Sequence, residues 1–245
     1  RVAGTDLIWQ PFPSHLKDAA LVVLMQENKL LSNYPWLLGL RGRADQRIAY
    51  WGHGRNLQST APAGLRERWK RWFVNRVDGW FAYTDATREL LVADGYPSAR
   101  IAVLDNAIDN EQFVRDLAAV SASQVAQCHA TLGSRPADPI GLYCGSLYPD
   151  KRLDLLVAAA DLVREKQPDF RLVVLGDGPS RAELEFAASS RPWLRCVGVQ
   201  RGIAKAAWFR VANAYLSPGA VGLHVLDAFC AGIPMITTID ARHGP

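Results

Sequence analysis

Long apolar runs, paired cysteines and a strong charge of either sign are all missing from this chain of 245 residues. No stretch approaches the ~18 apolar residues that a membrane-spanning helix needs, so we expect no transmembrane segment. The four cysteines form no CxxC pair and show no metal-ligand spacing, and we expect no metal site. Three of them lie in apolar segments, which predicts buried free thiols in a reducing compartment, the cytoplasm.

Charge and size narrow the possible functions further. The net charge of +4 is small and dispersed, so it favours small anionic partners such as nucleotides and argues against nucleic acid. The length and the apolar share of 49% allow one large or two ordinary domains. Because the chain begins at Arg1 without a methionine and ends at Pro245 in an expected loop, we expect a fragment of a longer protein, truncated at both ends.

Strands and helices are expected to alternate along the chain. In the first part, the expected strands are residues 6–9, 47–51, 79–83 and 101–104, and the expected helices are residues 14–40, 63–77 and 85–94. In the second part, the expected strands are residues 140–145, 171–175, 194–199, 213–216 and 234–239, and the expected helices are residues 153–166, 180–189, 203–211 and 222–231. The polar residues 116–138 are expected to form a linker between a first domain, 1–115, and a second domain, 139–245.

The expected strands of the second part are short and continuously apolar, and amphipathic helices alternate with them. This pattern predicts a parallel sheet that helices cover on both faces. The expected fold class is therefore α/β, with two Rossmann-like domains and a ligand cleft between them, because open parallel sheets bind ligands beyond the carboxyl ends of their strands.

The segment that begins at Gly219 combines two features of a ligand site. Gly219 and Gly222 open a helix, and the free amide groups from Val221 to Leu223 suit a phosphate. Asp227 lies among apolar neighbours in that helix, and an ionised carboxylate in such a setting needs a partner. A turn that binds phosphate and an acid that binds hydroxyls together suggest a sugar nucleotide. The alternative is that Asp227 only complements the helix dipole.

A possible diphosphate site follows the expected strand 140–145. Gly145 and Ser146 form the turn, and Lys151 and Arg152 come at the start of the next helix. A lysine supplies a point charge and an arginine a forked donor, so the two together could hold a diphosphate. The alternative is a solvated pair of surface charges.

Two further strand ends carry candidate residues. Gly176 and Gly178 follow the strand 171–175, where they allow close backbone approach or form a plain tight turn. Val199 ends the strand 194–199, and the backbone after it could contact the edge of a nucleobase.

The first domain offers a histidine and a basic aromatic helix. His53 follows a strand and has a glycine on each side, so it is either open to the cleft or a structural or solvated side chain. In residues 65–76 cations alternate with aromatic side chains. Such a helix either packs its aromatic side chains on the sheet, which we favour, or rests on an anionic membrane, in which case the protein works at the inner face of the cell membrane.

Five segments, residues 84–109, 141–156, 172–179, 197–199 and 222–234, resemble in order and spacing the motifs of retaining glycosyltransferases of the GT-B fold, in family 4. The resemblance implies transfer of a hexose from a nucleoside-diphosphate sugar of the UDP or GDP type to a glycan or lipid-linked acceptor. It also implies retention, independence of metal ions and other cofactors, and a place in polysaccharide or cell-envelope synthesis.

The resemblance assigns roles to individual residues. It implies that Lys151 and Arg152 hold the diphosphate, that Asp227 holds the ribose, and that His53 contacts the donor sugar; we predict catalytic roles for His53, Lys151 and Asp227. The predicted donor-binding set is Gly145, Ser146, Lys151, Arg152, Gly176, Gly178, Val199, Gly219, Val221, Gly222, Leu223 and Asp227.

Three of these positions depart from the family pattern. Gly219 and Asp227 stand where the family has two glutamates, and Ser146 stands where it has an arginine. Gly219 and Ser146 therefore keep a second hypothesis open, a module that binds nucleotide sugars without transferring them. A third hypothesis is a sugar-nucleotide epimerase on the same fold, which would need extra acid/base carboxylates in the cleft that the sequence does not indicate. The fragment by itself can be inactive even where the parent protein is an enzyme.

Overall fold

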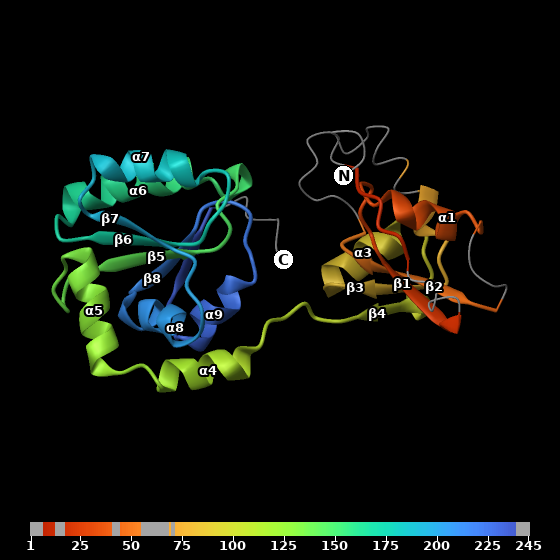
Figure 1. The fold of residues 1–245 in the computed structure, drawn as a ribbon, viewed down its shortest axis with the longest axis horizontal. Coiled ribbons are helices and arrows are strands. Elements are labelled where there is room, and N and C mark those ends of the chain that lie inside the picture. The colour runs from red at the N-terminus through yellow and green to blue at the C-terminus, as the bar shows by residue number, and fades with distance from the viewer. Residues whose placement is uncertain (1–6, 13–17, 41–44, 55–68, 70–71, 239–245) are drawn as a thin grey trace. The chain divides into compact units, whose positions relative to one another are not determined.

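The computed structural model describes residues 7–12, 18–40, 45–54, 69 and 72–238 (Figure 1). The chain divides into two compact units, Arg1–Asn106 and Ala107–Pro245. Each unit contains one parallel sheet with helices packed on it, which confirms the predicted α/β class with two Rossmann-like domains. No helix among the described residues is long and apolar enough to cross a membrane.

The first unit is built on a four-stranded sheet in the order β1-β2-β3-β4. Its elements are β1 (Leu21–Met25), a 3-10 turn (Leu31–Asn33), α1 (Tyr34–Leu37), β2 (Arg47–Gly52), β3 (Gly79–Ala82), α3 (Asp85–Ala93), a second 3-10 turn (Ser98–Arg100) and β4 (Ile101–Val103). Thr84 caps α3, because its hydroxyl accepts a hydrogen bond from the backbone N–H of Thr87. The second, third and fourth predicted strands and the helix 85–94 of this part are thus confirmed.

The two faces of this sheet differ in their surroundings. α1, α3 and residues 73–74 pack on one face, which includes Leu24 and Trp80, each 1% exposed. On the other face of β1, alternate side chains from Leu21 to Met25 are 40–45% exposed.

The largest correction concerns the predicted helix 14–40, whose residues 14–17 lie outside the described part of the chain. β1 occupies its middle and pairs in parallel with β2, from Leu21 opposite Arg47 to Met25 opposite Trp51. Two adjacent valines favour a strand over a helix. Within residues 18–40, the α-helix is limited to Tyr34–Leu37, and Pro35 lies in its first turn, where the missing N–H costs no hydrogen bond.

Two other predictions for the first unit change. The predicted strand 6–9 is reduced to a single β-bridge between Ile8 and Leu30, and Asp6 lies outside the described residues. Of the predicted helix 63–77, the structure describes residue 69 and residues 72–77, and it is helical at 69 and at 72–74. Phe73 is 2% exposed, as the packed alternative predicts, whereas Trp72 is 48% exposed with the Arg76 guanidinium 3.7 Å from its ring centre.

The second unit is built on a five-stranded sheet in the order β7-β6-β5-β8-β9. Its strands are β5 (Ile140–Cys144), β6 (Arg171–Leu175), β7 (Leu194–Gly198), β8 (Ala214–Ser217) and β9 (Met235–Thr237). Its helices are α4 (Asn110–Ala118), α5 (Ala122–Leu132), α6 (Leu153–Lys166), α7 (Arg181–Ser189), α8 (Gly202–Val211) and α9 (His224–Cys230). From β5 onward every predicted element is present, with bounds that differ by two residues at most.

Helices cover both faces of this second sheet. α6 and α7 pack on one face, and α4, α5, α8 and α9 pack on the other (Figure 1). The predicted linker 116–138 is thus largely helical and contributes to the core. The sequence suggested a linker because small and polar residues dominate it. A helix signal was nevertheless present, since Ser121 and Gln124 form a reciprocal capping box at the start of α5.

Candidate functional site

The strand order of the second sheet reverses between β5 and β8, and the loops after these two strands touch. The N–H of Ala220 donates to the carbonyl of Asp150 at 3.0 Å, and Lys151 Nζ donates to the carbonyl of Ala220 at 2.7 Å. The reversal point of an open parallel sheet, beyond the strand carboxyl ends, is where such folds bind ligands. Lys151 therefore lies at the turn of Gly219 and Gly222, as predicted.

Gly219 is needed for this loop contact. A Cβ atom at this position would lie 2.2 Å from the Asp150 carbonyl oxygen and 2.5 Å from the Lys151 carbonyl carbon. A glutamate, which the family pattern has here, does not fit without moving the backbone that carries Lys151.

A hollow of about 360 Å³ opens beside this point, at the carboxyl ends of β5, β6 and β7. Four predicted residues line it, namely Gly145, Ser146, Gly176 and Val199. The other lining residues are Cys144, Leu175, Asp177, Gln200, Arg201, Gly202, Lys205 and His224. The structure thus brings the ends of three consecutive strands to one hollow, as the sequence predicted.

Glycine is required where these loops cross. Gly176 has φ +140°, and a Cβ there would lie 1.8 Å from the Gly145 carbonyl oxygen. Gly178 packs in the same way on the backbone of Leu147, because a Cβ at Gly178 would lie 2.6 Å from the Leu147 carbonyl oxygen. Gly178 does not line the hollow. Backbone rather than side chains therefore forms this wall, which suits close approach of a phosphate or a sugar.

Asp227 has an ion-pair partner and a hydrogen-bond partner, as its apolar surroundings predicted. Its side chain is 0% exposed, and Lys205 Nζ donates to both carboxylate oxygens at 3.0 Å. His224 Nδ1 lies 2.6 Å from Oδ2 of the same carboxylate. Lys205 also lies 4.4 Å from the centre of the Phe113 ring. Asp227 itself does not line the hollow, but both residues that it binds do.

Lys205 and His224 are the residues that sequence reasoning missed. A signal existed for His224, because a residue three positions before Asp227 lies on the same helix face. None existed for Lys205, which comes from another helix 22 positions away in the sequence. Burial in this region also raises the pKa of the Cys144 thiol to about 12, so this lining residue stays protonated and is a poor nucleophile.

The remaining predicted residues lie elsewhere. Val221 and Leu223 lie in the turn before α9, and Leu223 is its N-cap residue. Arg152 is exposed, and its Nε lies 3.4 Å from Asp154 Oδ1. His53, in the first unit, packs its ring on Tyr83 with 4.3 Å between ring centres. Its predicted contact with the donor sugar and the predicted roles of Arg152 and Asp227 stay predictions.

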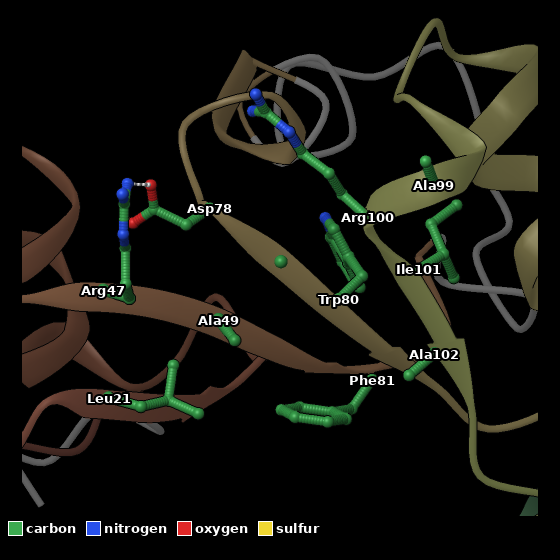
Figure 2. A pocket seen from close by; sticks show the side chains of 11 residues that line it. Leu21, Arg47, Ala49, Asp78, Trp80, Phe81, Ala99, Arg100, Ile101 and Ala102 are labelled. Carbon is green, nitrogen blue, oxygen red and sulfur yellow. Dashed lines mark hydrogen bonds and ion pairs between the residues drawn. The ribbon is translucent and has the colours of Figure 1, made fainter.

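A larger hollow, of about 600 Å³, lies at the amino ends of β1–β4 (Figure 2). Two of its three charged lining residues form an ion pair, in which Arg47 donates to Asp78 at 2.9 Å, and the third is Arg100. The pKa of Asp78 is lowered mainly by the hydrogen bond from the N–H of Ile48 and further by Arg47. Because ligands of parallel sheets bind at the opposite, carboxyl ends, we assign the candidate site to the second unit.

Comparison with known proteins places each half of the chain in a family. Residues 31–112 match the family model "Glycosyltransferase Family 4", and residues 138–244 match "Glycosyl transferases group 1". The D-inositol 3-phosphate glycosyltransferase of Kribbella flavida is 26% identical over 181 residues, which cover 66% of this chain and 41% of that protein. The chain thus spans less than half the length of this curated relative.

Solved structures share the fold at low identity. HepE (Alr3699) of Anabaena, in complex with UDP-glucose, has a TM-score of 0.68 at 15% identity, covering 94% of this chain and 62% of that one. The UDP-GlcNAc 2-epimerase of Neisseria meningitidis, bound to UDP-GlcNAc, has a TM-score of 0.63 at 14% identity, covering 93% and 63%. The two family models together match most of the chain, and the chain belongs to the group 1, family 4 glycosyltransferases of the GT-B fold.

Proposed function

We propose that the whole protein transfers a sugar from a UDP- or GDP-type nucleoside-diphosphate sugar to a glycan or lipid-linked acceptor, with retention and without a metal ion. The observation that carries the proposal is the hollow beyond β5–β7, beside the point where the strand order reverses. The nucleoside lies in the hollow near Val199, and the diphosphate lies between Ser146 and the turn at Gly222.

Lys151 is the residue that receives the departing diphosphate in this proposal. Its Nζ lies 3.8 Å from the Cβ position of Gly222, so the ammonium and the turn share one location. Negative charge builds on the diphosphate as the glycosidic bond breaks, and a fixed cation stabilises that charge more than it stabilises the bound donor. Gly219 has no side chain to act as a nucleophile, so we propose transfer on the same face without a covalent intermediate.

The binding test uses calorimetric titration with UDP, GDP and ADP. We expect one of these nucleotides to bind, and Lys151→Ala to weaken that affinity by roughly ten- to a hundredfold, because hydrogen bonds to charged groups contribute about 1.5–3 kcal/mol. Lys166→Ala is the matched control, since Lys166 is exposed at the end of α6 and does not line the hollow. Equal affinity in Lys151→Ala and wild type would remove Lys151 from the site.

Retention and metal independence need separate measurements on the full-length protein. The anomeric configuration of the product, read by NMR, is expected to match that of the donor. Turnover is expected to persist in EDTA. An inverted product contradicts the first expectation, and loss of turnover that Mg²⁺ restores contradicts the second.

A second candidate function is epimerisation of a sugar nucleotide. The observation that favours it is the fold shared with the UDP-GlcNAc 2-epimerase of Neisseria meningitidis. Incubation with UDP-GlcNAc alone separates the two functions. An epimerase produces the 2-epimer without any acceptor, whereas a glycosyltransferase needs an acceptor to consume its donor at a useful rate.

A further inference from the structure

The resemblance assigns the nucleotide ribose to Asp227, but the structure leaves this carboxylate no room for it. The Asp227 side chain is 0% exposed, and both of its oxygens accept hydrogen bonds from Lys205. Oδ2 also has His224 Nδ1 at 2.6 Å. A ribose would have to break this buried ion pair, which would leave the ammonium of Lys205, 17% exposed, without its partner.

His224 stands between Asp227 and the hollow. It is the first residue of α9, its side chain is 37% exposed, and it lines the hollow. A carboxylate can only accept, so the short contact places the imidazole proton on Nδ1. In the neutral imidazole Nε2 then carries the lone pair, and Nδ1 is already engaged by the carboxylate.

The charges around His224 decide which ligand atom suits Nε2. Lys205 balances Asp227, so the three side chains together carry no net charge when the imidazole is neutral. The other charged residues that line the hollow, Asp177 and Arg201, are of opposite sign. A lone pair attracts a hydroxyl donor, whereas a diphosphate has only acceptors to offer.

We propose that His224 contacts the ribose hydroxyls of the donor nucleotide, that Asp227 is a positioning residue that fixes the Nδ1–H tautomer, and that Lys205 is its buried counter-ion. This inference rests on the proposed function, because it takes the hollow to be the nucleoside site. It replaces direct recognition by a carboxylate with recognition through an Asp–His pair.

The test compares UDP with 2′,3′-dideoxy-UDP, which has the same base and phosphates but lacks both ribose hydroxyls. In calorimetric titration, wild type is expected to prefer UDP by roughly tenfold, the effect of one hydrogen bond. In His224→Phe the preference is expected to fall to about one, while the affinity for dideoxy-UDP stays near the wild-type value. The matched control is His129→Phe on α5, which lies outside the hollow and is expected to keep the wild-type preference.

The role of Asp227 needs a variant that buries no unpaired charge. Lys205→Met combined with Asp227→Leu removes both charges together and leaves His224 Nδ1 without its acceptor, and the melting temperature of this variant reports whether it folds. We expect its preference for UDP to fall towards one, and His224→Phe added to this double variant to change the preference no further. A wild-type preference in the double variant contradicts the positioning role, and a further fall on adding His224→Phe contradicts action through His224.

The possible failures are distinguishable. If UDP and dideoxy-UDP lose affinity in parallel in His224→Phe, the histidine contacts phosphate, and the inference is overturned while the proposed function stands. If wild type binds neither UDP, GDP nor ADP, the hollow is not a nucleotide site, and both proposals fail together.

Discussion

The tetrapeptide Leu-Val-Val-Leu occurs once in each unit, as residues 21–24 of β1 and residues 172–175 of β6. In β6 all four side chains are at most 1% exposed, because helices cover both faces of a strand that lies between two others. In β1 Leu21 is 45% exposed and Leu24 is 1% exposed. Identical residues in the same conformation therefore differ in burial because their strands have different positions and different cover in the two sheets.

This difference shows which sheet is a complete structural layer by itself. Parallel sheets are normally buried on both faces. The second sheet meets this rule, whereas the first leaves one apolar face of β1 exposed among the described residues. The candidate site lies in the second unit, where covered strands hold the loops that carry Ser146, Gly176 and Val199 on a rigid base.

Four leucine-to-alanine substitutions test the comparison, and the effects should be the largest of the set. Leu172→Ala and Leu175→Ala are each expected to lower the free energy of unfolding by about 2–5 kcal/mol, because each leaves a cavity on a different face of the sheet. Leu24→Ala should cost a similar amount. Leu21→Ala should cost less than about 1 kcal/mol, since its side chain is already half in water.

Hydrogen exchange at increasing urea concentrations measures the free energy of unfolding of each unit separately. A loss for Leu21→Ala as large as that for Leu24→Ala would mean that the exposed face of β1 is covered in solution, and the contrast between the sheets would disappear.

Two glycine-to-alanine substitutions, one at a strand end in each unit, should have smaller effects on the free energy of unfolding. Gly176→Ala places a methyl group on the Gly145 carbonyl at an unfavourable φ, and we expect a loss of about 3 kcal/mol together with weaker UDP binding. In Gly52→Ala the added Cβ would lie 2.9 Å from the Cβ of Gln26. We expect this variant to lower the free energy of unfolding by about 1 kcal/mol, with no change in UDP affinity. Thermal unfolding and calorimetry measure both quantities; equal losses of UDP affinity would contradict the assignment of the site to the second unit.

The smallest expected effect is the acid sensitivity of the first unit. The pKa of Asp78 is lowered in the folded state, mainly by the N–H of Ile48, so this contact stabilises the fold above the unfolded pKa of about 3.9. The stabilisation is lost as pH falls through the lower, folded value. Because the Asp78 side chain is 40% exposed, its contribution is at most about 1 kcal/mol.

Asp78→Asn should therefore lower the free energy of unfolding relative to wild type at pH 6, whereas near pH 2 variant and wild type should be about equally stable. Unfolding curves of wild type and variant at both pH values measure this. The prediction fails if the difference between the two proteins is the same at pH 6 and pH 2.

The Leu-Val-Val-Leu pair also explains how far the sequence predicts the fold. Residues 171–175 lie between Asp169 and Gly176, so their ends were clear. Residues 21–25 are flanked by helix-forming residues such as Ala20 and Gln26, and the sequence therefore suggested a longer helix. Pairing with β2 decides the conformation, and pairing between distant segments has no local signal.

The site follows the same division between local and distant signals. Gly145, Ser146, Gly176 and Val199 were predictable as candidates, because each lies at the carboxyl end of a recognisable strand or directly after it. Asp227 predicted a partner by its apolar surroundings, but Lys205 could not be named, since it approaches from another helix. The shape at Gly219 was also hidden, because a loop contact with Asp150 and Lys151 requires that glycine.

In our proposal the second unit binds the nucleotide in the hollow beyond β5–β7. Hydrogen exchange of the wild-type protein, with and without saturating UDP, tests it most directly. We expect slower exchange of the backbone amides around Gly145, Gly176 and Gly202, with exchange in β1–β4 unchanged. Slower exchange confined to the first unit, or UDP bound with no protection at these three loops, would contradict it.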